Sequence, residues 1–162
     1  MGFEYYEETI QQRKCMKPTQ FSATKNTPGG NFMIFKEVGH SERYEELLAR
    51  MNGIDEYHRM AAYIMALIPW IREDDVFDFE RDCIRPQGIL ADWQTQTSRA
   101  ATRLMFSLWN GCWQDVASEN PEKTSMYYTP DSIFCSSRYL PYFFEAIRIM
   151  HGLVDIHHTE IK

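Results

Sequence analysis

The chain has 162 residues, with 23 Asp and Glu against 17 Lys and Arg, and a net charge of −6 at pH 7. Hydrophobic residues make up 44% and aromatic residues 14% of the sequence, which is enough to fill the core of one domain and excludes wholesale disorder. The acidic balance argues against a basic surface over most of the protein, and therefore against direct binding of nucleic acid.

Neither a membrane segment nor an export signal is indicated. No apolar run approaches the ~20 residues that a membrane helix needs. Residues 1–8 are acidic and aromatic, whereas a signal peptide has a basic start followed by an apolar stretch. We therefore expect a cytoplasmic protein that does not bind membranes.

Residues 1–40 differ in character from the rest of the chain. Residues 4–16 can form a short helix, and residues 17–30 contain two prolines and two glycines, which is typical of a linker. The apolar residues 32–35 suit a short strand or a clip against the core. We expect residues 1–40 to form an N-terminal arm and linker.

A helical core is predicted over residues 41–152, because four segments carry apolar residues at helical spacing. They cover residues 41–51, 55–68, 98–109 and 139–150. Ser41 and Asp55 can cap the first two helices, and Gly53, Pro69, Gly111 and Gly152 supply end signals.

A further helix start is indicated by Thr129 as cap and Pro130 in the first turn, after a polar surface loop at residues 115–126. With no convincing sheet, the predicted fold is all-α or mostly α, a compact domain of four to six helices. Residues 153–162 are expected to form a mobile C-terminal tail.

One stretch, residues 72–82, is strongly acidic, with a local charge of −4. Its apolar members, Val76, Phe77 and Phe79, are expected to anchor it while its acids face water. It lacks the glycine and ligand alternation of a calcium-binding loop. The acids form either a solvated face or a negative patch that docks on a basic protein surface, and the candidate partner-binding residues are Glu73, Asp74, Asp75, Asp78, Glu80 and Asp82.

The segment 93–103 is the candidate for a small ligand. Hydroxyls and unpaired backbone N–H groups at a helix start can hold an anion. Arg99 and Arg103 are four residues apart, so both can reach one phosphate or carboxylate from the same helix face, unless they pair with the acidic stretch. Alternatively, Thr97 or Ser98 only caps the helix. The candidate ligand-binding residues are Trp93, Thr95, Thr97, Arg99 and Arg103.

No catalytic residue, metal or cofactor is predicted. The histidines lie in separate segments, apart from the adjacent His157 and His158, and none shows the spacing of a helical metal site. Cys135 lies near a helix start, where a thiol can become reactive, but no base can be assigned to it.

Several segments together resemble an uncharacterised family of small proteins from Gram-positive bacteria, found in phage-like or conjugative elements. They are Trp93 to Arg99, Thr102 to Leu104, Leu108 to Gly111, Asp131 to Cys135 and Pro141 to Phe143, with His40 to Tyr44 and Asp82 to Pro86 upstream. The similarity covers most of residues 35–148 and leaves out the arm. It implies a mobile element in bacterial cytoplasm as the setting, and no catalytic residues.

Two functional hypotheses follow. The first is a non-enzymatic acidic accessory protein of a phage or mobile element. It would bind and inhibit a host protein with a basic surface, such as a defence nuclease, as anti-CRISPR proteins do. The alternative is a protein that sequesters a small ligand or nucleotide through residues 93–103. An enzyme using Cys135 or a histidine-bound metal ranks last, and the oligomeric state stays open.

Overall fold

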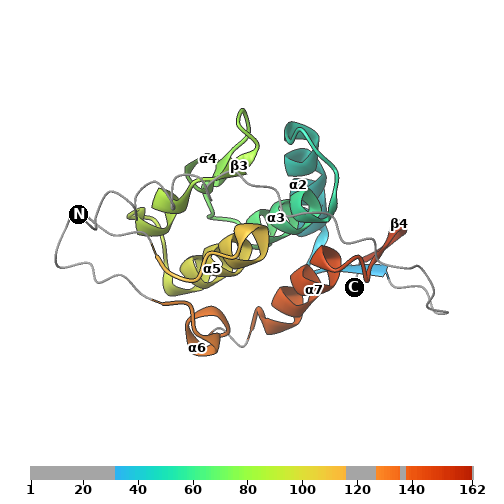
Figure 1. The fold of residues 1–162 in the computed structure, drawn as a ribbon. Helices are drawn as coiled ribbons and strands as arrows, with labels where there is room; N and C mark the ends of the chain where they lie inside the picture. The colour runs from blue at the N-terminus through green and yellow to red at the C-terminus, as the bar shows by residue number, and fades with distance from the viewer. Residues whose placement is uncertain (1–31, 116–126, 136–137, 162) are drawn as a thin grey trace, which may run out of the picture.

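A computed structural model describes residues 32–115, 127–135 and 138–161 (Figure 1). The described part contains six α-helices, which confirms the predicted mostly helical class. The helix expected at residues 4–16 and the linker at 17–30 lie outside it, as does most of the loop at 115–126. In chain order the elements are β1 (Phe32–Phe35), α2 (Val38–Arg50), α3 (Glu56–Leu67), α4 (Glu73–Val76), β2 (Phe77–Asp78), β3 (Cys83–Ile84), the 3-10 helix η1 (Pro86–Leu90), α5 (Gln96–Asn110), α6 (Pro130–Ile133), α7 (Leu140–Met150) and β4 (Asp155–Ile161).

Helix α3 is the centre of the core. Every residue from Met60 to Ile68 is buried, because this segment is apolar on all sides. Helices α2, α5 and α7 each pack against it (Figure 1). Asp55 caps it as predicted, accepting hydrogen bonds from the backbone N–H groups of Tyr57 and His58.

Helix α2 begins at Val38, before the predicted start at Ser41. The buried ring of His40 accounts for the difference. Its Nδ1 accepts a hydrogen bond from the N–H of Lys36, and its Nε2 lies 3.0 Å from the carbonyl oxygen of Tyr63 in α3. Ser41 is therefore inside the helix, and its hydroxyl donates to the carbonyl of Val38 instead of capping the helix.

The two ends of the described chain meet in a small sheet. Strand β1 pairs in parallel with β4 and contacts α7 (Figure 1). On the other edge of β1, side chains satisfy the backbone groups of Ile34. The N–H of Ile34 donates to Glu145, and the carbonyl oxygen of Ile34 accepts from the hydroxyl of Tyr63. Parts of the expected arm and of the expected mobile tail therefore belong to the folded structure.

The starts of α5 and α6 show reciprocal capping by hydroxyl side chains. Thr95 caps α5 together with Ser98, so the cap lies two residues before Thr97. Thr129 caps α6 with Ser132, as predicted for this position. None of the helices in the described segments is long and apolar enough to cross a bilayer.

Candidate functional site

The first half of the acidic stretch is held by arginines of α2. Glu73 accepts from Arg43 at 2.9 Å and from Arg50 at 3.2 Å, and Asp74 accepts from Arg50 at 2.6 Å. Burial acts to raise the pKa of Glu73, but hydrogen bonds from its own backbone N–H and from Arg43 outweigh it, so the pKa lies below its usual value. These ion pairs tie α4 to α2.

In the second half of the stretch, Asp78 is buried. It accepts hydrogen bonds from the backbone N–H groups of Glu80 and Arg81, and from the guanidinium of Arg85 at 3.1 Å. The bond from Arg81 is the main reason that the pKa of Asp78 lies below its usual value. Asp78 therefore stabilises a turn, which corrects the expectation that every acid of the stretch faces water.

Asp82 also has an internal role. Its backbone is left-handed, with φ of 55°, and its carboxylate lies 2.7 Å from Nε2 of the fully buried His58. Asp55 lies 2.5 Å from Nδ1 of the same ring, and Trp109 packs edge-on against it. The two carboxylates on one imidazole fasten the turn after β2 to the start of α3.

Little net negative charge remains on the stretch once these contacts are counted. Three arginines from outside it, Arg43, Arg50 and Arg85, bring the local charge from −4 to −1. Of the six predicted partner-binding acids, Asp74, Asp75 and Glu80 are exposed.

The unpaired negative charge lies on α2 instead. Glu42, Glu45 and Glu46 are exposed, and none of them forms an ion pair with a basic side chain in the described segments. The same helix directs Arg43 and Arg50 toward α4. The arginines of helix α2 therefore contact the acids of α4, whereas its glutamates face the solvent.

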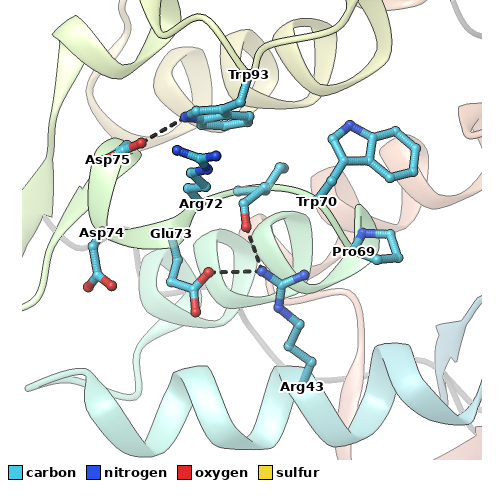
Figure 2. Close-up of a pocket in the computed structure, with 9 residues that line it drawn as sticks. Arg43, Pro69, Trp70, Arg72, Glu73, Asp74, Asp75 and Trp93 are labelled. Atoms are coloured by element: carbon cyan, nitrogen blue, oxygen red, sulfur yellow. Dashed lines mark hydrogen bonds and ion pairs between the residues drawn. The ribbon is translucent and has the colours of Figure 1, made fainter.

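An open pocket of about 690 Å³ lies where α2, α4 and the segment after α3 meet (Figure 2). Trp93 closes one side, and its indole N–H donates to Asp75 at 2.7 Å. Trp70, 45% exposed, has its indole N–H 3.3 Å from the hydroxyl of Thr95. We call this the Trp70–Trp93 pocket; its lining residues are Arg43, Pro69, Trp70, Ile71, Arg72, Glu73, Asp74, Asp75 and Trp93.

The two pocket arginines differ in how they are held. Arg43 rises from α2 and donates to the carbonyl oxygens of Ile68 and Ile71 as well as to Glu73 (Figure 2). Arg72 is exposed and points toward Trp93, and its side chain forms no hydrogen bond or ion pair with any residue in the described ranges (Figure 2). The side chain of Arg43 is therefore a fixed part of the pocket lining, whereas the side chain of Arg72 is available to bind a ligand.

The structure separates the predicted ligand residues. Only Trp93 lines the pocket. Arg103 is buried and makes a two-bond ion pair with Asp115, at 3.1 and 2.6 Å, so it cannot share an anion with Arg99. The pKa of the neighbouring Tyr128 is raised, mainly by burial and secondly by the negative charge of Asp115. The expectation that Arg99 and Arg103 grip one ligand is corrected, because they have different surroundings.

Five of the nine lining residues were not among the predicted candidates: Arg43, Pro69, Trp70, Ile71 and Arg72. A signal for Trp70 is present in the sequence: a large aromatic residue directly follows Pro69, which ends α3, and precedes the acidic stretch. Arg43 gives no such signal, because its partners lie 25 to 30 residues further along the chain.

The fold and pocket define a small, mostly helical domain with an open site of aromatic and charged side chains. Within the described residues, no group of three or more His, Cys, Asp and Glu is placed to hold a metal ion. The chain belongs to a family of unknown function, DUF6075, whose family model matches residues 31–160. No curated protein and no solved structure matches the chain. The expected membership of an uncharacterised family is confirmed, and the match includes the residues of β1.

Proposed function

We propose that this protein is a non-enzymatic binding protein that docks through its acidic face on a basic surface of another protein. The observation that carries the proposal is the row of unpaired glutamates on α2. Glu46 lies three residues after Arg43 and four before Arg50, so by helical geometry it borders the side that contacts α4. The acidic face comprises Glu42, Glu45 and Glu46 of α2, together with Asp74 of α4, which is exposed and bound to Arg50 of α2.

Carboxylates of this kind act mainly on the rate of association. Exposed charges of one sign attract a partner of the opposite sign over about a Debye length, and salt weakens the attraction. Nuclease surfaces that bind nucleic acid are basic because they must neutralise phosphates. A host defence nuclease fits this chemistry, and a phage or conjugative element of a Gram-positive bacterium, acting in the cytoplasm, is the setting that the sequence resemblance implies.

The test compares two charge-matched double variants. Glu42→Lys with Glu46→Lys reverses two charges on the acidic face, whereas Glu56→Lys with Asp131→Lys reverses two exposed charges on α3 and α6. Tagged full-length chain captures proteins from a bacterial lysate at about 0.05 and 0.5 M salt, and the affinity of the captured basic protein is then measured.

The α2 variant should lose about tenfold in affinity at low salt, since each reversed exposed charge contributes about 0.5–1 kcal/mol. The α3 and α6 variant should bind nearly as the wild type does. Equal binding by both variants, or binding that does not respond to salt, would contradict the proposal.

One observation favours a second candidate, a protein that sequesters an anionic small ligand such as a nucleotide. The side chain of Arg72 has no partner in the described part of the chain and lies in the pocket beside Trp93. A thermal-shift screen of nucleotides checks it. A rise in Tm that Arg72→Ala abolishes would support the ligand, and no rise with any nucleotide would leave docking as the better account.

A further inference from the structure

We propose that the Trp70–Trp93 pocket receives an arginine side chain of the basic partner. This inference rests on the proposed function, since it names the group that the acidic face would recognise. Tryptophan ring faces attract guanidinium cations, and Trp and Arg dominate the residues that carry binding energy in protein interfaces.

The ring of Trp70, which is 45% exposed, is the main apolar surface that the pocket offers to a ligand, because the guanidinium of Arg72 lies beside the ring of Trp93 (Figure 2). The indole N–H of Trp93 is already bonded to Asp75, and that of Trp70 to Thr95. These bonds hold both rings by their edges, so a ligand gains no hydrogen bond from them. A flat cation gains from stacking on a ring that is already held in place.

Two carboxylates among the lining residues complete the match, and one of them, Asp75, lies beside Trp93 (Figure 2). Asp74 uses Oδ1 for Arg50, and Asp75 uses Oδ2 for Trp93. The second oxygen of each carboxylate has no partner in the described segments, and the side chain of Asp74 is 72% exposed. A guanidinium has donors in a planar fork and can bind carboxylates while it stacks, which the single ammonium of lysine does less well.

The positive charge of Arg72 would repel an arginine side chain in the pocket. Its removal therefore tests whether the ligand is a cation or an anion. Its charge faces the same pocket and has no internal acceptor in the described part of the protein. Removing it should strengthen the binding of a cation and weaken the binding of an anion. Substitution of Arg43 would not give this test, because it would remove the ion pair with Glu73 and disturb the side of the pocket that this pair forms.

The experiment titrates the full-length chain with a nine-residue peptide of alternating Gly and Arg, and follows the four indole N–H signals by NMR. The matched control peptide carries citrulline, which is neutral and has nearly the same shape, in place of Arg. We expect the arginine peptide to shift the signals of Trp70 and Trp93. The signal of Trp113, which is exposed and stacked on Tyr127 away from the pocket lining, should stay in place.

Three variants complete the test. Asp75→Asn and Trp70→Ala should each weaken peptide binding about three- to tenfold, and Arg72→Ala should strengthen it by a similar factor. Equal shifts with the citrulline peptide, no shift at Trp70 and Trp93, or weaker binding by Arg72→Ala would each overturn the proposal. The last result would point to an anionic ligand instead.

Failure of this inference can be told from failure of the proposed function. If the peptide binding responds to Glu42→Lys with Glu46→Lys but the pocket signals do not move, docking stands and the pocket is not its anchor. If the pocket signals move and the α2 variant binds as the wild type does, the pocket binds arginine but the face on α2 does not steer the partner.

Discussion

Three buried ionisable side chains in the described part of this protein have defined partners. His58 lies between Asp55 and Asp82, Arg103 makes two bonds to Asp115, and His40 contacts two backbone groups. Burying a charge without a partner costs several kcal/mol, so these pairings specify how the helices meet more than they add stability. They also leave exposed residues such as Arg72 as the ones able to bind other molecules.

The titration of His40 predicts how stability depends on pH. Burial lowers the pKa of His40 to about 4, against about 6.5 in the unfolded chain. Between these values the unfolded chain binds a proton that the folded chain does not. The free energy of unfolding should therefore fall as the pH is lowered from about 7 to about 4, by about 3 kcal/mol from this residue.

Urea unfolding of the wild type and of His40→Gln at several pH values measures this contribution. The difference between their unfolding free energies should shrink toward acid pH, because the variant has lost the titrating group. The exposed His151→Gln serves as the control and should keep the wild-type profile. Parallel profiles for wild type and His40→Gln would show that His40 does not titrate in this range.

Among the elements, α4 is positioned by its neighbours. It has four residues, too few to form a stable helix alone, and it is held by Arg43 and Arg50 of α2 and by contact with η1. Its carboxylates supply one side of the Trp70–Trp93 pocket. The shape of the pocket therefore depends on how closely η1 approaches α4.

Gly88 in η1 sets this approach. A Cβ atom there would lie 2.2 Å from the carbonyl oxygen of Asp75, which is backbone and cannot move aside cheaply. Gly88→Ala should lower the free energy of unfolding by about 1–3 kcal/mol. The matched control is Gly39→Ala in the first turn of α2, where no atom beyond the neighbouring residues and the backbone of the same helix lies within 4 Å of the new Cβ.

Urea unfolding of the two alanine variants checks this prediction. Gly39→Ala should be neutral or more stable than the wild type by up to about 1 kcal/mol, because alanine favours helix. If both alanine variants unfolded at the same urea concentration as the wild type, η1 and α4 would not be packed as closely as described.

For the whole molecule, the pairing of β1 with β4 joins the two ends of the described chain. Met33 and Phe35 alternate into the core from β1, and Ile34 between them is exposed and is held by Glu145 and Tyr63. The sheet therefore covers the side of the core formed by α2 and α7. Stability should depend on both ends being present.

Ending the chain at Gly152 tests this dependence by removing β4. Each backbone hydrogen bond lost from β1 should cost about 1 kcal/mol, and each kcal/mol lowers the Tm by about 2–4 °C for a chain of this length. Thermal unfolding followed by circular dichroism measures the change. A truncated chain with the Tm of the full chain would mean that β4 does not stabilise the core in solution.

The helical class follows from patterns that are local in the sequence. Apolar residues at helical spacing located α3, α5 and α7, and the caps at Asp55 and Thr129 were predicted from residue type and the apolar or proline residues that follow. These features involve residues within a few positions of one another, so one sequence is enough to find them. The strand pair β1 and β4 joins residues more than 120 positions apart, which no local pattern indicates.

By itself, the sequence determined an acidic, mostly helical domain, because composition and periodicity depend on neighbouring residues alone. Only the tertiary structure decided which charges remain exposed and unpaired in the described part of the chain. Arg43 and Arg50 reach the acids of α4 across the fold, Arg103 is buried on Asp115, and the carboxylates of α2 remain exposed. Whether a charge is neutralised depends on which groups lie within about 4 Å in space, and long-range packing sets that distance.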